Sequence, residues 1–396
     1  MNVAEVNADT GLPANLQFWV FFLVAAAFAT IYITQPVLPI LQVEFGVNET
    51  RASLTISAVI FGIALSNLPL GMAADRFPIK PLVCIGGCVI TLCGLVCAGT
   101  DRMSILIATR FVQGLFIPCL TTCVAAYLAK TLPIVRLNVV MGSYVAATVA
   151  GGLGGRLLGG FIHPPLHWRY AFVTASAILL TATIAACYFL PAEKRGTTAD
   201  AGSKGFLDLI MQTDLLRIFS VAFSAFFVFS SVFNFLPFYL AAPPFGVSTQ
   251  VITLTYGSYL IGIAMGPLSG KLSNRLGNGT IMALGALVFA GALALTLIKS
   301  VPGVAVTLAL ICAGFFSVHS AAAGSLNRRL TSSRGRANSL YVLFYYLGGF
   351  CGISLSGYMY VWLGWPGIVA MGSLMLVIPF SSGVWELLTE RNSSGE

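Results

Sequence analysis

The sequence predicts an all-α membrane protein: twelve transmembrane helices arranged as two pseudo-symmetric six-helix bundles. Three observations lead to this fold class. The chain of 396 residues is 57% hydrophobic, only 9% of its residues are charged, and its apolar residues gather in long runs. The mean hydropathy is +0.90. Soluble domains average about 25% charged residues, so this composition excludes a cytosolic enzyme, a disordered chain and a nucleic-acid-binding protein.

The apolar runs are long enough for helices to cross a bilayer, which takes about 20 residues each. Strands are excluded because an open strand leaves its backbone polar groups unsatisfied in lipid. The first six runs lie at 17–41, 53–73, 82–99, 104–129, 138–161 and 171–190, and the last six at 217–240, 251–270, 280–298, 303–326, 339–363 and 367–388.

The segment before the first run has Glu5 and Asp9 but no Lys or Arg, and about 25 mostly apolar residues follow. A cleavable signal peptide has a basic flank and a shorter apolar core. We therefore expect the first run to remain as a spanning helix.

The longest polar segment, Pro191 to Thr213, separates the two sets of six runs. We predict an N-terminal bundle at 1–193, a cytoplasmic linker at 194–213 with a short surface helix near 206–211, and a C-terminal bundle at 214–396.

The basic residues predict the orientation. With the N-terminus in the cytoplasm, fifteen of the 21 Lys and Arg residues fall in cytoplasmic segments and four on the opposite side. Arg110 and Arg156 are the two left inside apolar runs. The positive-inside rule then puts both termini in the cytoplasm of a bacterial-type inner (plasma) membrane. The formal charge of +8 thus reports topology rather than affinity for nucleic acid.

The two halves of the chain repeat each other. Residues 71–78 correspond to 270–277 at an offset of 199, and the fifth run aligns with the eleventh at an offset of 197. Duplication of a six-helix unit, with rocking of the halves around a site near the midplane, is the architecture of alternating access. The matched positions in the fifth and eleventh runs are Gly151, Gly152, Gly155, Gly160 and Trp168 with Gly348, Gly349, Gly352, Gly357 and Trp365.

The segment from Gly71 to Lys80 resembles the signature loop of the major facilitator superfamily, G-x-L-A-D-R-x-G-R-R/K. Pro78 and Ile79 depart from that pattern. The resemblance implies that Asp75 accepts hydrogen bonds from a helix N-terminus or a basic residue across the bundle interface and so holds a gate closed. The alternative is a solvated turn. The gating residues predicted in both repeats are Gly71, Asp75, Arg76, Lys80, Asn274 and Arg275.

Arg110 and Gln113 lie in a segment that resembles the R-x-x-Q-G motif of the same superfamily. A charge inside a span costs at least about 2.5 kcal/mol on insertion scales, so Arg110 is a functional candidate. Its alternative is to reach along the helix to the membrane surface.

The fifth run resembles the drug-proton antiporter motif G-x8-G-x3-G-P-x2-G-G, with Arg156 in place of the proline. Glycines at this spacing permit close helix packing. The segments 151–160, 313–320 and 340–349 resemble the YnfM-like branch of the drug-proton antiporter group. The glycines predicted to pack are Gly142, Gly151, Gly155, Gly159 and Gly160.

A proton-coupled carrier needs a titratable group inside the membrane, yet none of the 13 acidic residues lies in mid-span. His319 is the best candidate because histidine titrates near neutral pH; otherwise it is a packing residue. With cations inside and no carboxylate, the cavity is expected to be electropositive. The residues predicted to line it are Tyr32, Gln35, Arg110, Gln113, Arg156, Asn234, His319 and Tyr346.

These patterns predict a secondary active transporter for a small organic solute, with proton-coupled efflux as the leading mode. An anionic, zwitterionic or neutral amphipathic solute is favoured over a cationic one. An importer or facilitator of an organic anion is the alternative, and a non-transporting sensor is a distant one. We expect a monomer in contact with membrane lipid, with protons as the coupling ion, and no enzymatic activity, cofactor or metal.

The nine cysteines all fall in apolar runs and form no CxxC pair. They are interpreted as small apolar helix residues and not as a disulfide framework.

Overall fold

The computed structural model is helical, without strands, over the residues it describes, which are all except 1–13, 133, 191–204, 331–333 and 395–396. Within that part of the chain, twelve spans are long and apolar enough to cross a membrane. The predicted fold class is confirmed. The span boundaries agree within a few residues, as for Val301–Arg328 against the predicted run at 303–326.

The first six spans form one bundle. The first span is α1, η1 and α2 in succession, and the fourth is α5 and α6, which meet just after Pro118. The helices are α1 (Ala14–Tyr32), η1 (Gln35–Val37), α2 (Leu38–Phe45), α3 (Glu49–Arg76), α4 (Ile79–Gly99), α5 (Met103–Leu120), α6 (Thr122–Thr131), α7 (Ile134–Ile162) and α8 (Arg169–Phe189).

The last six spans form the other bundle, preceded by the short helix α9, which matches the helix predicted near 206–211. Most of the predicted linker at 194–213 lies outside the described residues. The helices are α9 (Phe206–Ile210), α10 (Thr213–Ala241), α11 (Thr249–Thr255), η2 (Tyr256–Ser258), α12 (Tyr259–Leu276), α13 (Asn278–Leu295), α14 (Val301–Arg328), α15 (Arg334–Leu363) and α16 (Trp365–Ser394).

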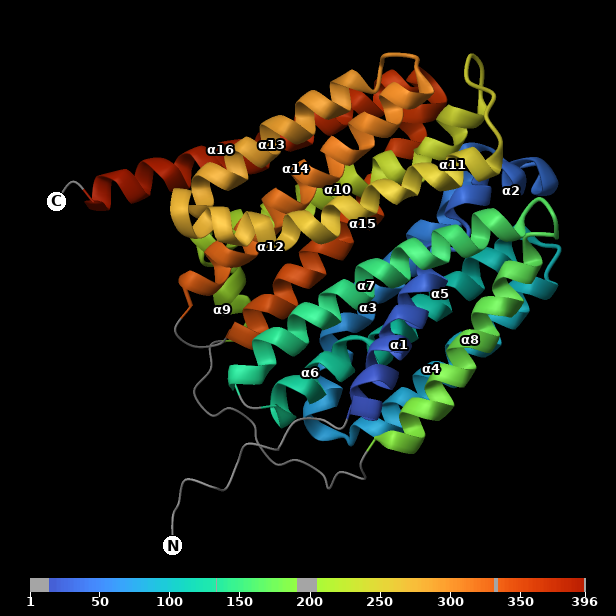
Figure 1. The fold of residues 1–396 in the computed structure, drawn as a ribbon, viewed down its shortest axis with the longest axis horizontal. Helices are drawn as coiled ribbons and strands as arrows, with labels where there is room; N and C mark the ends of the chain where they lie inside the picture. The colour runs from blue at the N-terminus through green and yellow to red at the C-terminus, as the bar shows by residue number, and fades with distance from the viewer. Residues whose placement is uncertain (1–13, 133, 191–204, 331–333, 395–396) are drawn as a thin grey trace, which may run out of the picture.

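The two bundles lie side by side, blue to green and yellow to red in Figure 1. Helix α1 begins and α16 ends at the same end of the molecule, which we call the terminal end; α2 and α11 lie at the opposite, distal end (Figure 1). Helices within a bundle pack mainly on one another, while α3 and α15 also pack together across the two bundles.

Small residues bring equivalent helices of each bundle into backbone contact. A Cβ added to Gly151, Gly155 or Gly159 of α7 would overlap a backbone carbonyl oxygen of the first span. The same holds for Gly348 and Gly352 of α15 against α10. The α7–α1 and α15–α10 contacts therefore repeat each other, as the offset of 197 residues predicts.

Contacts between the bundles gather toward the distal end. Gly160 of α7 lies against Thr253 of α11, and Gly357 of α15 lies against Thr50 of α3. The amide of Asn234 on α10 donates to Ser53 Oγ on α3 over 2.8 Å. At this end the bundles therefore meet through small and polar side chains, while further along α3 and α15 Phe61 stacks on Phe350 at 4.5 Å.

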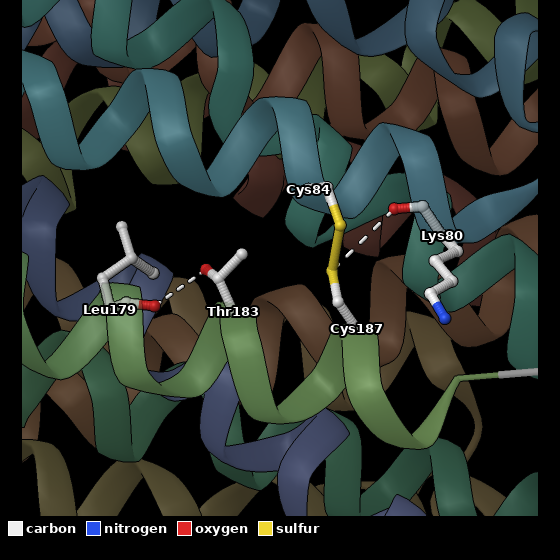
Figure 2. Close-up of a disulfide and its surroundings, with 5 residues drawn as sticks. All are labelled: Lys80, Cys84, Leu179, Thr183 and Cys187. Atoms are coloured by element: carbon white, nitrogen blue, oxygen red, sulfur yellow. Dashed lines mark hydrogen bonds between the residues drawn. A yellow bond between two sulfur atoms is a disulfide. The ribbon is translucent and has the colours of Figure 1, made fainter.

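A disulfide joins Cys84 of α4 to Cys187 of α8 near the terminal end, one turn of α8 beyond Thr183 (Figure 2). The interpretation of all nine cysteines as unpaired apolar residues is therefore wrong for this pair. Sequence spacing could not indicate it, because 103 residues separate the two cysteines and only the packing of α4 on α8 brings their Cα atoms to 6.5 Å. The remaining seven cysteines are free.

Candidate transport site

Arg110 of α5 is completely buried inside the first bundle. Its guanidinium donates to the carbonyl oxygens of Thr30 and Ile31 in the last turn of α1, and its Nε donates to Thr55 O of α3 over 2.9 Å. Helix C-termini leave carbonyl groups without intrahelical partners and favour a nearby cation. Arg110 therefore compensates for the interruption of the first span that follows Tyr32.

Gln113 completes this arrangement. Its Oε1 accepts from Arg110 over 2.8 Å, and its Nε2 donates to Ile90 O of α4 over 3.0 Å. The pair links four helices, and Arg110 does not reach the membrane surface as its alternative required. Its guanidinium is surrounded by backbone oxygens. We therefore interpret Arg110 as a residue that holds the helices of the bundle together rather than one that contacts the solute.

Arg156 of α7 occupies a different environment, between the bundles. Its Nε donates to Gln35 Oε1 over 2.6 Å, and its Nη2 donates to the Tyr259 hydroxyl of the other bundle over 2.8 Å. The guanidinium carbon lies 3.9 Å from the ring centroid of Tyr32 and 4.3 Å from that of Tyr259. A third ring, Tyr256, lies at 5.4 Å.

The electrostatics around Arg156 are unusual for a side chain only 2% exposed. No carboxylate of the described residues pairs with it, and its hydrogen-bond acceptors are an amide oxygen, a hydroxyl and the carbonyl of Gly152. Aromatic faces supply the remaining stabilisation of the cation. Arg156 therefore has positive charge available for an anionic group, and it touches both bundles.

His319 of α14 lies among aromatic side chains of the second bundle and is only partly buried. Its Nδ1 is 2.9 Å from the Tyr341 hydroxyl, whose oxygen also lies 3.3 Å from the His319 carbonyl oxygen. The rings of Phe315 and Tyr345 lie 5.9 and 5.3 Å from the imidazole. Contact with Tyr341 leaves Nε2 as the ring nitrogen that can exchange a proton.

The structure separates the predicted cavity residues into groups. Tyr32, Gln35 and Arg156 form one cluster, whereas Arg110 and Gln113 pack within the first bundle. Tyr346 contacts Tyr345, which neighbours His319. Asn234 is buried at the contact between α10 and α3.

Three tyrosines of this site are absent from the sequence prediction: Tyr256, Tyr259 and Tyr341. Tyr256 and Tyr259 are three residues apart and so share a helix face, which is a signal in the sequence. Their partner, Arg156, is about a hundred residues away, so only the assembled bundles reveal the cluster.

The predicted gating residues lie at the terminal end. Asp75 pairs with Lys130 of the same bundle over 2.9 Å, and its side chain is 60% exposed. Among the described residues, the ion pair of Asp75 thus lies within one bundle rather than across the interface. In the repeat, Arg328 donates to Asn274 Oδ1 over 3.2 Å, so the ends of the second and fourth spans of each half are joined equivalently.

The other predicted gating residues belong to the same two turns. Gly71 and Arg76 lie in the last part of α3, Lys80 is the second residue of α4, and Arg275 lies in the last turn of α12. The predicted packing glycine Gly142 differs from its four partners, because no atom lies within 4 Å of the position where its Cβ would be.

Among the described residues, one acid is buried in the second bundle. Glu386 of α16 accepts from Ser325 Oγ over 2.6 Å and lies 3.3 Å from Arg329 and 3.6 Å from Arg217. Both arginines reach it from the terminal end, where Asp214 also pairs with Arg329. This carboxylate is compensated locally and belongs to a charge cluster separate from Arg156.

Twelve spans in two repeated bundles, with polar groups enclosed where the bundles meet, define a membrane transporter. The sequence model of the Major Facilitator Superfamily matches residues 20–318 and 241–395 of this chain. The chain belongs to this family. It is a multi-pass membrane transporter of that superfamily.

Individual relatives agree with this assignment. The MFS-type transporter YybF of Bacillus subtilis is 28% identical over 357 residues, 89% of this chain and 88% of YybF. The inner membrane transport protein YnfM of Escherichia coli is 28% identical over 362 residues, 90% of this chain and 87% of YnfM. The crystal structure of the nucleoside transporter NupG (D323A mutant) has the same fold, with a TM-score of 0.78, 12% identity, and coverage of 94% and 99%.

Proposed function

We propose that this protein is a proton-coupled exporter that moves a small organic solute across the inner membrane by alternating access. The solute is anionic, zwitterionic or neutral and amphipathic, in preference to cationic. The observation that carries the proposal is Arg156, a buried guanidinium that touches both bundles and has no carboxylate partner among the described residues.

Alternating access requires contacts that form in one state and break in the other. The contact between Arg156 and Tyr259 joins α7 to α12, so separation of the bundles at the distal end breaks it. A cation that loses a partner in this way gains from a negatively charged or polar solute group in the same place. Binding of the solute and opening of the bundles are thereby coupled.

His319 is the proposed proton-carrying group. It is partly exposed, and Tyr341 holds its ring by the hydrogen bond to Nδ1. A protonated imidazole adds positive charge to the second bundle, and its loss of a proton removes that charge. The positive charge that the solute encounters thus depends on whether His319 is protonated.

The direction of transport is proposed from the glycine spacing of α7, which resembles the drug-proton antiporter motif. The competing mode, an importer or facilitator of an organic anion, is favoured by Arg156 itself, because it stands where that motif has proline. With both termini in the cytoplasm, the terminal end faces the cytoplasm, and Asp75 and Arg76 belong to the cytoplasmic gate of a monomer.

The test uses the full-length protein in liposomes with a pH-sensitive dye inside. Solutes of each charge type are added, and proton movement driven by the solute gradient is recorded. We expect an anionic or zwitterionic solute to drive proton counterflow in the wild type, and His319→Gln to lose the counterflow while still binding solute. His167→Gln, altered in the connection between α7 and α8, is the matched control and should behave as the wild type.

Solute movement that does not depend on the pH gradient would contradict a proton-coupled exporter and favour a facilitator. No movement of any solute would overturn the transport proposal, and an unchanged His319→Gln variant would remove His319 from the coupling step.

A further inference from the structure

We propose that the solute is an aromatic monocarboxylate, with its carboxylate on Arg156 and its ring against the row of aromatic side chains that leads from Arg156 to His319. This inference rests on the proposed transport function and names the substrate class of the same site. It follows from two features of the structure, the unused hydrogen-bonding capacity of Arg156 and the continuity of the aromatic row.

The first feature is the guanidinium. Arginine has five N–H donors in a planar fork that matches a carboxylate. The described hydrogen bonds of Arg156 go to three acceptors, all of them neutral: Gln35, Gly152 and Tyr259. A carboxylate that takes the place of the Tyr259 hydroxyl exchanges a neutral acceptor for a charged one and neutralises a buried cation.

The second feature is the row of rings. Tyr259, which covers Arg156, lies 5.4 Å from Phe229, and Phe229 stacks on Phe315 at 3.9 Å. Phe315 is parallel to the His319 imidazole at 5.9 Å, and Tyr345 lies 5.3 Å from the same imidazole. An unbroken series of aromatic contacts thus connects the buried cation to the imidazole.

The exposed parts of this row decide which ligand it fits. Phe229 and Phe315 are buried and form the backing of the row, while Tyr345 and His319 retain partly exposed surfaces, as does Tyr32, which lies against Arg156 outside the row. A planar ring of the solute that packs on these uncovered ring faces gains both apolar burial and favourable ring–ring geometry. A flexible aliphatic chain gains only the burial.

The charges around the site favour a solute that carries a single carboxylate. Arg110, the other buried arginine near the first span, gives four of its five N–H donors to Thr30, Ile31, Thr55 and Gln113 and is completely buried, so it is not accessible to a second anionic group. An aromatic amine would place its cation beside Arg156 with no described carboxylate to receive it. One anion, attached to a ring, is the combination that satisfies both features.

The experiment measures binding to the purified full-length protein in detergent by isothermal titration calorimetry. The probes are benzoate, cyclohexanecarboxylate, benzamide and benzylamine, which vary the charge and the ring one at a time. We expect benzoate to bind most tightly and cyclohexanecarboxylate several-fold more weakly. Removal of a charged hydrogen-bond partner should reduce benzoate affinity at least about tenfold in Arg156→Gln.

Matched variants separate recognition from folding. Arg102→Gln removes an exposed arginine of the distal end and should bind benzoate as the wild type does. Tyr259→Phe keeps the ring over Arg156 but removes its competing hydroxyl, so benzoate affinity should be retained or increased. If Arg156→Gln does not fold, Arg156→Lys and Tyr259→Phe carry the test, with benzoate binding weakened in the first and preserved in the second.

Benzylamine that binds as tightly as benzoate, or benzoate binding that survives Arg156→Gln, overturns the substrate class. So does equal affinity for benzoate and cyclohexanecarboxylate. Failure of the transport proposal is distinguishable from these outcomes: it would appear as Arg156-dependent binding of benzoate to protein that moves no solute or proton in liposomes.

Discussion

In the part of the chain that the structure describes, two arginines lie buried within membrane spans, and their partners give them different roles. Arg110 donates to backbone carbonyls of α1 and α3, which are permanent parts of one bundle. Arg156 contacts neutral side chains from both bundles, so the bundle movement proposed above would change these contacts. At the scale of residues, the partners of a charge, more than its burial, separate a structural role from a role in transport.

Replacing Arg110 should therefore affect folding before it affects transport. Arg110→Ala leaves buried carbonyl oxygens of α1 and α3 without donors, and we expect a loss of stability on the order of 3 kcal/mol or more. The midpoint of thermal unfolding in detergent measures the loss of stability, and the yield of monodisperse protein is a second readout. Arg102→Ala, an exposed arginine at the start of the same helix, is the control. An unchanged unfolding midpoint in Arg110→Ala would contradict the assigned role.

At the scale of helices, the two bundles use glycine in the same way. Gly155 on α7 meets the backbone of α1, and Gly352 on α15 meets the backbone of α10. These approaches exclude any side chain, because the atom met is a backbone oxygen that cannot turn aside. The interhelical distance of each pair is thus determined by the lack of a Cβ.

Neighbouring glycines of α7 provide a direct test. A methyl group at Gly155 would overlap Ala29 O, whereas no atom lies within 4 Å of the corresponding position at Gly154. We expect Gly155→Ala to destabilise the protein by about 1–3 kcal/mol through overpacking. Gly154→Ala should be neutral or slightly stabilising, because alanine favours the helix more than glycine does. The measurement is the midpoint of thermal unfolding of both variants. Equal midpoints would show that α1 and α7 can move apart to accommodate a methyl group at no cost in stability.

At the scale of the whole molecule, the two bundles pack against each other mainly through α3 and α15. Within the first bundle, α4 and α8 are covalently linked by the Cys84–Cys187 disulfide (Figure 2). Between the bundles, the described contacts include small residues packed along α3 and α15, the stack of Phe61 on Phe350, and the Arg156–Tyr259 and Ser53–Asn234 hydrogen bonds. Such an interface suits relative motion of intact bundles.

Cross-linking the bundles should therefore stop transport. In a background that keeps only Cys84 and Cys187, the pair Ser53→Cys and Asn234→Cys places thiols where the described side chains lie 2.8 Å apart. A short cross-linker that attaches to both thiols through disulfide bonds is expected to abolish solute movement in liposomes, with recovery when reduction cleaves those bonds. The background protein alone should transport with its own disulfide formed or reduced. Normal transport by the cross-linked protein would refute motion of the bundles at this contact.

Much of the architecture follows from the sequence because its signals are local. Each span is a continuous apolar run, and the repeat of glycines at a constant offset predicts equivalent helix contacts in both halves. The site is predicted less completely. Arg156 and Gln35 are recognisable as polar groups inside spans, but Tyr259, which completes their cluster, lies 103 residues from Arg156 and carries no signal of that contact.

The sequence by itself determined the membrane class, the twelve spans and the superfamily, since these depend on composition and on patterns along each helix. The tertiary structure alone decided that Arg110 stabilises a helix end, that Asp75 pairs within its own bundle, and that Cys84 meets Cys187. It also brought Arg156 between the bundles, beside rings from both. The physical reason is that desolvation and hydrogen bonding depend on which helices pack together, and the order of residues along the chain does not specify those neighbours.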